Sequence, residues 1–287
     1  MELGAVFPQK EIGNDPAVIK AFAQAVEEMG FTHLLLYDHV LGADPDRPGG
    51  WRGGYDKDDA FHEPFVTMGY LAAVTEKLTL TTTVLILPQR QTALVAKQAA
   101  EVDVLSGGRL RLGVGTGWNQ IEYEALNEDF STRGQRQAEQ VELMRKLWTE
   151  DSLTYQGKWH TVTKASINPR PARPIPIWFG GNAPALLKRT AALGDGWMPL
   201  MGPNDKAKAA LDTIYEQMQA NGRDTANFGI QAQAQARGGD PDRWQSHAAK
   251  WRGLGATHLA IATMDADFKT VDEHLDAMRR YYEAVNG

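Results

Sequence analysis

The residues best suited to chemistry follow a short apolar run, LLLYDHV, at positions 34–40. Asp38 and His39 end a segment that otherwise has the character of a buried strand. An imidazole titrates near neutral pH and can donate or accept a proton, while a neighbouring carboxylate can fix its tautomer or hold a hydroxylated ligand. The residues alone leave two interpretations, a structural histidine at a strand end and a catalytic His39.

Glycines mark a second place where a ligand can approach the chain. In GVGTGWN, positions 113–119, glycines stand at the alternate positions Gly113, Gly115 and Gly117, so a flat ligand can lie close to the backbone there. The spacing is not that of G-x-G-x-x-G opening directly into a helix. A Rossmann dinucleotide site is therefore not predicted.

A third stretch, FGGNAP at positions 179–184, leads from a strand directly into a helix. Backbone N–H groups and the helix dipole converge there on a point suited to a phosphate. Gly181, Asn182 and Ala183 are the candidate residues. The alternative is an ordinary turn capped by Asn182 or Ala183, and the position at the end of a strand favours the phosphate site.

The elements that must position these residues alternate between strand and helix along the whole chain. Such alternation is typical of parallel strands joined by crossover helices, and eight pairs predict a closed (β/α)8 TIM barrel, for which about 250 residues is usual. We expect one domain over residues 1–287. The predicted strands are Leu3–Phe7, His33–His39, Leu78–Leu87, Arg109–Val114, Ile175–Phe179, Gly196–Pro199, Phe228–Gln233 and His258–Thr263. The predicted helices begin near Asp15, Pro64, Thr92, Gln135, Pro184, Asn204, Pro241 and Thr270.

Two insertions account for the extra length. Residues 42–62, after strand two, are rich in Gly, Pro and Asp but also contain Trp51, Tyr55 and Phe61. They predict either a disordered surface loop or a lid over a substrate pocket. Residues 151–174, before strand five, predict a small hairpin and a proline-rich connection.

Composition excludes several classes of function. The chain has 287 residues, of which 43% are hydrophobic, with a formal net charge of −6 and no cysteine. Nucleic-acid and membrane partners are not expected, because there is no basic run and no long apolar span. Disulfides and thiolate metal sites are excluded, and we expect a cytoplasmic protein without a signal peptide.

Other polar residues predict structure more than function. Arg133, Arg136 and Glu139 favour a capped, salt-bridged helix face over a substrate clamp. His33 and His258 open strands at the opposite end of the barrel, where residues serve stability. The seven histidines show no metal-ligand spacing, so no metal site is predicted.

Taken in order, these motifs resemble the luciferase-like superfamily of flavin- and F420-dependent oxidoreductases. The resemblance runs to about residue 200. It is strongest in KQAAEVDVLSGGRLRLGVGTGW, STRGQRQAEQVELMRKLW, PIWFGGNAP and LGDGWMPL.

The resemblance implies roles for the candidate residues. His39 corresponds to the catalytic histidine of the F420-dependent branch and Asp38 to its cofactor-contacting acid. A non-prolyl cis peptide behind the cofactor ring falls at Thr83-Val84. The remaining cofactor residues are Gly115, Thr116 and Gly117 at the ring or polyol, and Gly181, Asn182 and Ala183 at the phosphate.

Trp118 departs from the pattern of the F420-dependent sugar-phosphate dehydrogenases, which carry a catalytic glutamate at this place. A glucose-6-phosphate dehydrogenase activity is therefore not expected. A tryptophan favours a more apolar substrate or one that stacks on its ring. Trp51, Trp118 and Trp197 are expected to share the pocket wall.

The resemblance implies hydride transfer between F420 and a small organic substrate, with His39 exchanging the accompanying proton. The first alternative is an FMN-dependent monooxygenase that uses oxygen and a separate reductase, since both cofactors share a tricyclic ring and a phosphate. The second is a flavin-binding protein without turnover, against which the Asp-His pair argues. A homodimer is expected from the resemblance alone.

Overall fold

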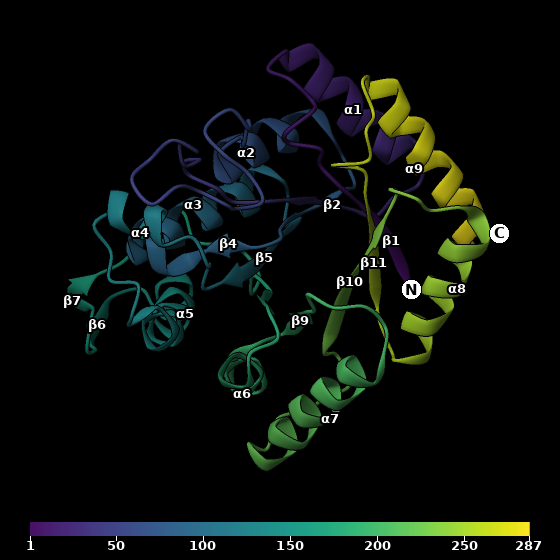
Figure 1. The fold of residues 1–287 in the computed structure, drawn as a ribbon. Helices are drawn as coiled ribbons and strands as arrows, with labels where there is room; N and C mark the ends of the chain where they lie inside the picture. Colours follow the sequence, from purple (N-terminus) through teal and green to yellow (C-terminus); the bar gives the residue numbers. More distant parts are fainter. Residues whose placement is uncertain (287) are drawn as a thin grey trace.

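A parallel sheet closes into a barrel in the computed structural model, which describes residues 1–286 (Figure 1). The strand order is β3-β2-β1-β11-β10-β9-β8-β5-β4, and the pairing of β3 with β5 closes the ring. Because β3 and β4 are two parts of one interrupted strand, the barrel has eight strand positions, and the predicted (β/α)8 fold is confirmed. The barrel strands are β1 (Glu2–Val6), β2 (His33–Leu36), β3 (Thr79–Thr82), β4 (Leu85–Ile86), β5 (Leu110–Gly115), β8 (Ile177–Gly180), β9 (Gly196–Met198), β10 (Gly229–Gln235) and β11 (His258–Ala262).

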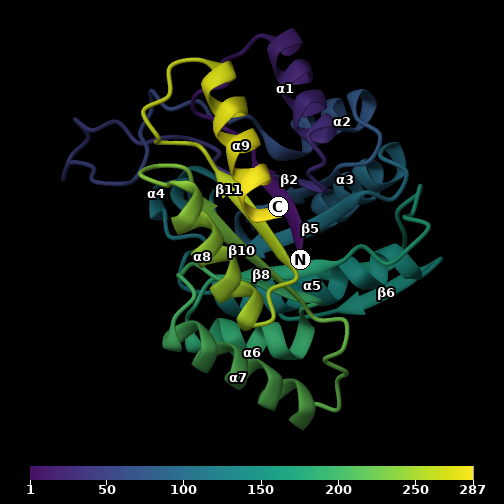
Figure 2. The ribbon, with the colours of Figure 1, turned by 90° about the vertical axis from the view of Figure 1, so that its right-hand side faces the viewer.

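The helices surround the barrel (Figures 1 and 2). Their starts follow the predicted caps: Asp15 accepts a hydrogen bond from Ala17 N, and Asp240 accepts one from Arg243 N. None of the helices in residues 1–286 combines the length and apolarity that a bilayer crossing requires. The helices that follow the strands are α1 (Pro16–Glu28), α2 (Pro64–Val74), α3 (Thr92–Leu105), α5 (Arg133–Thr149), α6 (Pro184–Leu193), α7 (Asp205–Ala220), α8 (Pro241–Gly253) and α9 (Val271–Asn286).

Strand alternation separates the core under the helices from the barrel interior. On β5, Leu110, Leu112 and Val114 are fully buried in the main hydrophobic cluster. The intervening residues of β5 point into the barrel, because neighbouring side chains on a strand face opposite sides. Arg111 and two glycines therefore lie inside the barrel, and the barrel interior is where ligands and unusual polar groups are to be sought.

The two insertions lie where the sequence places them. The connection between β2 and α2 spans residues 37–63 and extends away from the barrel (Figure 2). The second insertion is the predicted hairpin, made of β6 (Leu153–Gln156) and β7 (Thr161–Ala165).

Two short helices were not predicted, α4 (Gln120–Ala125) and the 3-10 helix η1 (Leu87–Gln89). Asn119 caps α4 through a hydrogen bond from Ile121 N to its side chain. The predicted strand Leu78–Leu87 is interrupted after Thr82 and ends where η1 begins.

Candidate active site

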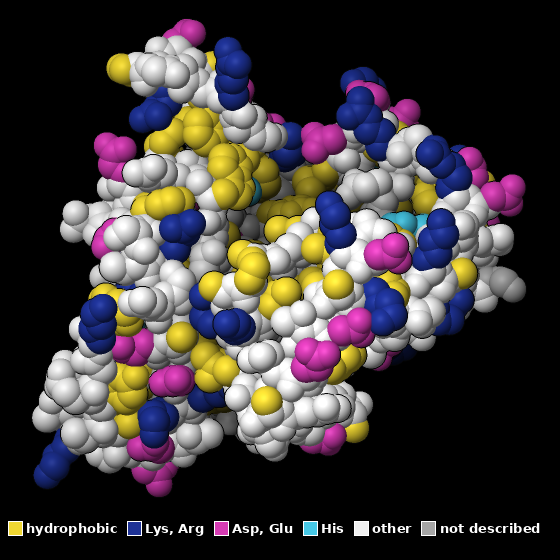
Figure 3. Space-filling view, turned by 60° about the horizontal axis from the view of Figure 1, so that its bottom comes forward, with side chains coloured by type: hydrophobic (Ala, Val, Ile, Leu, Met, Phe, Trp, Pro, Cys, Tyr) yellow, Lys and Arg dark blue, Asp and Glu magenta, His cyan; other side chains and the backbone are white. Residues whose placement is uncertain are grey.

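A pocket of about 520 Å³ opens at the C-terminal ends of the strands, beside the hollow that hydrophobic side chains surround in Figure 3. This is the end at which barrel enzymes carry their active sites. Eleven of the thirteen predicted site residues line the pocket, and the exceptions are Trp51 and Trp197. The eleven are Asp38, His39, Thr83, Val84, Gly115, Thr116, Gly117, Trp118, Gly181, Asn182 and Ala183.

Asp38 and His39 both reach this pocket because β2 ends at Leu36, earlier than predicted. Once the strand has ended, neighbouring side chains need not point to opposite faces. The Asp38 carboxylate accepts hydrogen bonds from Ile86 N at 2.8 Å and from Arg90 Nη2 at 2.7 Å. Asp38 therefore anchors β4 to the end of β2.

His39 has a carboxylate behind it that the sequence did not reveal. Glu122 on α4 is buried, and its Oε1 lies 3.4 Å from His39 Nδ1. Burial raises the pKa of Glu122, but the contacts with His39 and Gln89 and the hydrogen bond from Val40 N outweigh it, so the net pKa is lowered. Nδ1 is buried and has no hydrogen-bond partner within residues 1–286, so the ionised carboxylate beside it favours the tautomer with the N–H at Nδ1.

The interrupted strand forms the floor of the pocket. The Thr83-Val84 peptide bond is cis, as the resemblance implies. A Cβ on Gly115 would meet Val84 Cγ2 at 2.3 Å, and one on Gly180 would meet Val84 Cγ1 at 2.5 Å. Glycine is therefore needed at 115 and 180 to admit the Val84 side chain, which differs from the direct ligand approach expected from the sequence.

Gly117 has a comparable constraint. Its φ is +66°, and a Cβ would meet Ile86 Cγ2 at 2.7 Å. The neighbouring Thr116 carbonyl accepts a hydrogen bond of 2.6 Å from Tyr123 on α4. These contacts fix the turn between β5 and α4, and both residues still line the pocket.

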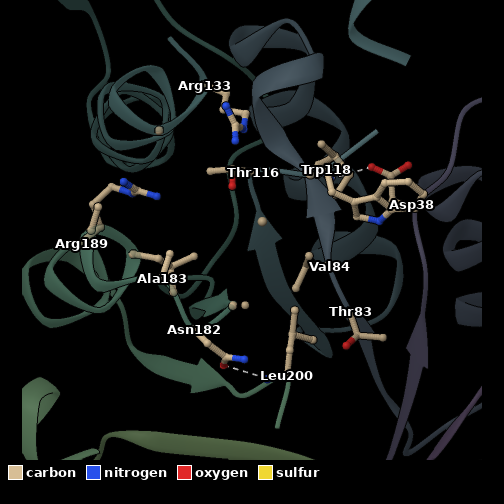
Figure 4. Close-up of a pocket in the computed structure, with 18 of the residues that line it drawn as sticks. Asp38, Thr83, Val84, Thr116, Trp118, Arg133, Asn182, Ala183, Arg189 and Leu200 are labelled. Atoms are coloured by element: carbon tan, nitrogen blue, oxygen red, sulfur yellow. Dashed lines mark hydrogen bonds between the residues drawn. The ribbon is translucent and has the colours of Figure 1, made fainter. Parts of the chain in front are cut away.

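The Gly181-Asn182-Ala183 turn leads into α6 as predicted. Ala183 is the N-cap and provides no side-chain hydrogen bond to the first turn. The Asn182 side chain is engaged elsewhere, because its Oδ1 accepts a hydrogen bond from Leu200 N at 3.0 Å (Figure 4). Pro184 at the first helical position has no N–H, and Leu186 N and Leu187 N donate to the Ala183 carbonyl at 2.8 and 3.0 Å. No side chain caps this turn, so the Ala185 N–H is the group at the start of α6 that is placed to meet an anion.

Two arginines complete this end of the pocket. Arg133 on α5 and Arg189 on α6 point toward the cavity, opposite Trp118 and Asp38 (Figure 4). Within residues 1–286, no carboxylate lies within 4 Å of either guanidinium. Burial and the charge of Arg133 lower the pKa of Arg189. Two cations beside a helix N-terminus make this end of the pocket electropositive, a candidate site for an anion.

The neighbours of Arg133 are structural, as expected. Arg136 forms a 3.1 Å ion pair with Glu128 and donates to the Pro88 carbonyl. Glu139 accepts hydrogen bonds from the backbone of Trp159 and His160 in the hairpin connection. The prediction of a helix-face role is correct for Arg136 and Glu139, whereas Arg133 faces the pocket.

Residues 42–62 form a lid over His39. The rings of Tyr55 and Phe61 lie 3.9 and 4.7 Å from the His39 ring, centroid to centroid. Asn119 donates a 2.7 Å hydrogen bond to the Tyr55 hydroxyl, which ties the lid to the start of α4. These contacts over His39 support the lid interpretation of this segment.

The three predicted tryptophans have different positions. Trp118 is 55% exposed at the pocket, and Trp51 stacks on it with centroids 5.6 Å apart and planes at 16°. Trp51 thus supports Trp118 from the lid without lining the cavity. The placement of Trp197 in the pocket wall is wrong: its side chain is fully buried in the core, and its Nε1 donates to the Gly181 carbonyl at 2.7 Å.

The structure is therefore a TIM barrel whose pocket at the C-terminal ends of the strands is lined by His39, by Val84 on the interrupted strand and by the Gly181-Asn182-Ala183 turn. The family model of luciferase-like monooxygenases matches residues 1–285, and the chain belongs to this family. It is an oxidoreductase of the luciferase-like type.

Relatives and solved structures agree with this assignment. The chain is 38% identical over 214 residues to a protein of uncharacterised function from Mycobacterium tuberculosis, covering 72% of this chain and 73% of the relative. It is 30% identical over 282 residues to an F420-dependent glucose-6-phosphate dehydrogenase from Segniliparus rotundus, covering 92% and 77%.

Two solved structures share the fold. One is an F420-dependent secondary alcohol dehydrogenase in complex with an F420-acetone adduct, with a TM-score of 0.82, 18% identity, and coverage of 99% of this chain and 98% of that chain. The other is a monooxygenase from Streptomyces bottropensis, with a TM-score of 0.84, 20% identity, and coverage of 100% and 99%. At these identities the likeness concerns the fold alone.

Proposed function

We propose that the protein transfers hydride between coenzyme F420 and a small, neutral organic substrate. The observation that carries the proposal is His39, held by Glu122 behind it and facing the pocket above the Thr83-Val84 floor. The choice of F420 is supported by the 30% identical relative, which is named an F420-dependent dehydrogenase.

The pocket residues fit such a cofactor. Val84 and Ile86, with the glycines that admit them, provide a flat apolar floor for a tricyclic ring. Arg133, Arg189 and the first turn of α6 would hold the phosphate. The bound deazaflavin would supply or accept the hydride, and the protein contributes position and proton transfer.

His39 would exchange the proton that accompanies the hydride. Proton donation in the reducing direction requires the doubly protonated ring: Nε2 would give its proton to the substrate oxygen, while the Nδ1 N–H stays directed at Glu122 and the ring is left neutral. Tyr55 and Phe61 cover the ring and exclude water from the transfer.

The substrate end of the pocket is aromatic and lacks an available charge. The carboxylates of Asp38 and Glu122 are each only 1% exposed and are engaged by Arg90 and His39. Trp118 presents an exposed ring backed by Trp51. A conjugated or aromatic neutral compound would stack on Trp118 with no charge left unpaired.

Replacing Trp118 by alanine is expected to raise KM for a conjugated cyclic substrate by about tenfold, because stacking and apolar burial are lost. Trp118→Phe is the matched control and should retain most of the affinity. The kcat and the cofactor dissociation constant should stay near the wild-type values, and a change confined to cofactor binding would place Trp118 at the cofactor instead. Steady-state kinetics checks the prediction.

The alternative is an FMN-dependent monooxygenase, which the lid also suits, because oxygen chemistry on a reduced flavin requires exclusion of water. Titration of the purified apoprotein with F420 and with FMN, each oxidised and reduced, separates the two functions. Micromolar binding of F420 with much weaker FMN binding is expected. The reverse preference would replace the proposal by the monooxygenase, and tight binding without turnover of any substrate would indicate a non-catalytic flavin-binding protein.

Partners are also proposed. We infer a homodimer from the exposed apolar side chains of residues 1–286, which fall into two groups. The first group, Val40, Trp118 and Leu200, lies near the pocket. The second group lies on α2 and α3, and we propose this surface as the dimer interface. Sedimentation velocity would show whether the protein is a dimer. The second group is Val66, Tyr70, Leu94, Val104 and Leu105. A flavin or F420 reductase would supply reduced cofactor.

A further inference from the structure

The barrel interior contains a polar layer at the end opposite the active site. Arg111 on β5 lies over the Trp178 ring on β8, 4.4 Å from its centroid. Trp178 contacts His258 on β11 at 5.0 Å, and His258 contacts His33 on β2 at 5.2 Å, centroid to centroid. Barrel interiors are usually filled by branched apolar side chains, so this layer requires a reason.

Glycines on neighbouring strands make room for the layer. A Cβ on Gly4 would meet His33 Nε2 at 2.2 Å. On Gly196 and Gly229 it would meet the Trp178 ring at 2.4 and 2.0 Å. The large polar and aromatic rings therefore occupy positions that the backbone is built to accommodate.

Arg111 carries an incompletely compensated charge. It is 5% exposed, its Nε donates to Thr81 Oγ1 at 3.2 Å, and its Nη2 has no hydrogen-bond partner. No carboxylate of residues 1–286 lies within 4 Å of its guanidinium. Burial lowers the pKa of Arg111 to about 10, opposed by the charge of Glu2. A buried cation without a close partner is costly, and an anion beside it would be stabilising.

The two histidines add no charge to this layer. Burial, followed by the charge of Arg111, lowers the pKa of His33 far below its usual value and that of His258 to about 3. Both are neutral at physiological pH, so they contribute hydrogen-bonding ring nitrogens but no charge. Arg111 therefore dominates the electrostatics of the group.

A cavity of about 460 Å³ gives access to the layer. Arg111, Trp178 and His258 line it together with Arg173, Asp195 and Glu2. Arg173 is paired with Asp103 at 2.7 Å, and Asp195 with Arg145 at 2.8 Å. Their charges are thus largely balanced.

Of the carboxylates that line this cavity, Glu2 is the one placed to compete with a bound anion for Arg111. Its side chain is 57% exposed, and its Oε2 lies 3.2 Å from His258 Nε2 and 3.1 Å from Thr32 Oγ1. It therefore lies at the rim of the cavity and does not reach the Arg111 guanidinium.

We propose that this cavity binds a small oxyanion, a carboxylate or phosphate, on the guanidinium of Arg111. The site lies at the opposite end of the barrel from the proposed cofactor phosphate site and does not depend on the proposed function. An oxyanion pairs with the planar fork of an arginine, which matches its geometry better than a lysine would.

The test measures thermal stability during titration with sodium phosphate and, separately, sodium acetate. The double variant Arg133→Gln/Arg189→Gln serves as background, because it removes the anion site at the other end. A saturable rise in Tm with either anion is expected, and adding Arg111→Met should weaken the apparent affinity by roughly tenfold or more. The proposal would be overturned if Tm rose equally with and without Arg111→Met in this background, or if neither anion gave a saturable rise in Tm.

A second variant keeps the test decisive if Arg111→Met fails to fold. Glu2→Gln removes the competing negative charge at the rim and is expected to strengthen binding of the same anion severalfold. Unchanged or weaker binding in Glu2→Gln would place the anion away from this cavity.

Discussion

Replacing His39 by alanine is expected to lower kcat by about 10²- to 10⁴-fold, the usual contribution of a positioned general acid or base. The cofactor dissociation constant should change by less than about threefold, which corresponds to under 1 kcal/mol. The ring lies between Tyr55 of the lid and Glu122, and neither of the arginines that would hold the phosphate contacts it. Single-turnover kinetics and a fluorescence titration measure the two quantities.

Two controls separate proton transfer from packing. His39→Phe keeps an aromatic ring against Tyr55 and Phe61 but cannot exchange a proton, so it should lose as much turnover as His39→Ala. Glu122→Gln keeps an oxygen for Val40 N and removes only the charge. It should reduce kcat by about 10- to 100-fold, as a group that orients a functional histidine does. Equal losses of turnover and cofactor affinity in His39→Ala would make His39 a binding residue.

The barrel was predictable because each strand and helix carries its own local signal. Apolar runs, proline just inside helix starts and caps such as Asp15 and Asp240 all act within a few residues. The turn proposed to bind phosphate is likewise local, since FGGNAP contains both the end of β8 and the start of α6. These features needed no knowledge of tertiary contacts.

The parts of the site that were missed depend on contacts between distant segments. Glu122 acquires significance only because α4 carries it behind His39, and α4 itself was not predicted. The signal available in the sequence was Asn119, a residue type that favours the N-cap, directly before QIEYEA, which forms α4. Arg189 was similarly present in NAPALLKR, but its approach to Arg133 results from the packing of α6 beside α5.

Trp197 was misplaced because the sequence does not show which residues of β9 face the barrel interior. β9 contains only Gly196, Trp197 and Met198, too few residues for alternation to indicate which side faces the barrel interior. Met198 faces inward, where a Cβ on Gly113 would meet its sulfur at 2.7 Å. Trp197 therefore faces the helices, where it supports the Gly181 carbonyl from the core.

The arginine pair leads to the second large expected effect. Arg189→Gln and Arg133→Gln should each raise the dissociation constant of the phosphate-bearing cofactor by about 10- to 100-fold, because each removes a charge-assisted hydrogen bond worth about 1.5–3 kcal/mol. Thermal stability without cofactor should be unchanged or higher, since the repulsion that lowers the pKa of Arg189 is relieved. An isothermal titration and a melting curve test both effects.

Arg145→Gln is the matched control for these variants. It removes the same charge from α5, but Arg145 pairs with Asp195 away from the pocket, so cofactor binding should remain at the wild-type value. The corresponding cofactor without its phosphate should bind wild type and Arg189→Gln equally, because only the phosphate meets the guanidinium. An equal loss of affinity for both cofactor forms would show that Arg189 shapes the pocket through packing. A loss confined to the phosphate-bearing form would assign α6 and its arginine to phosphate binding, and that assignment would orient the ring toward His39.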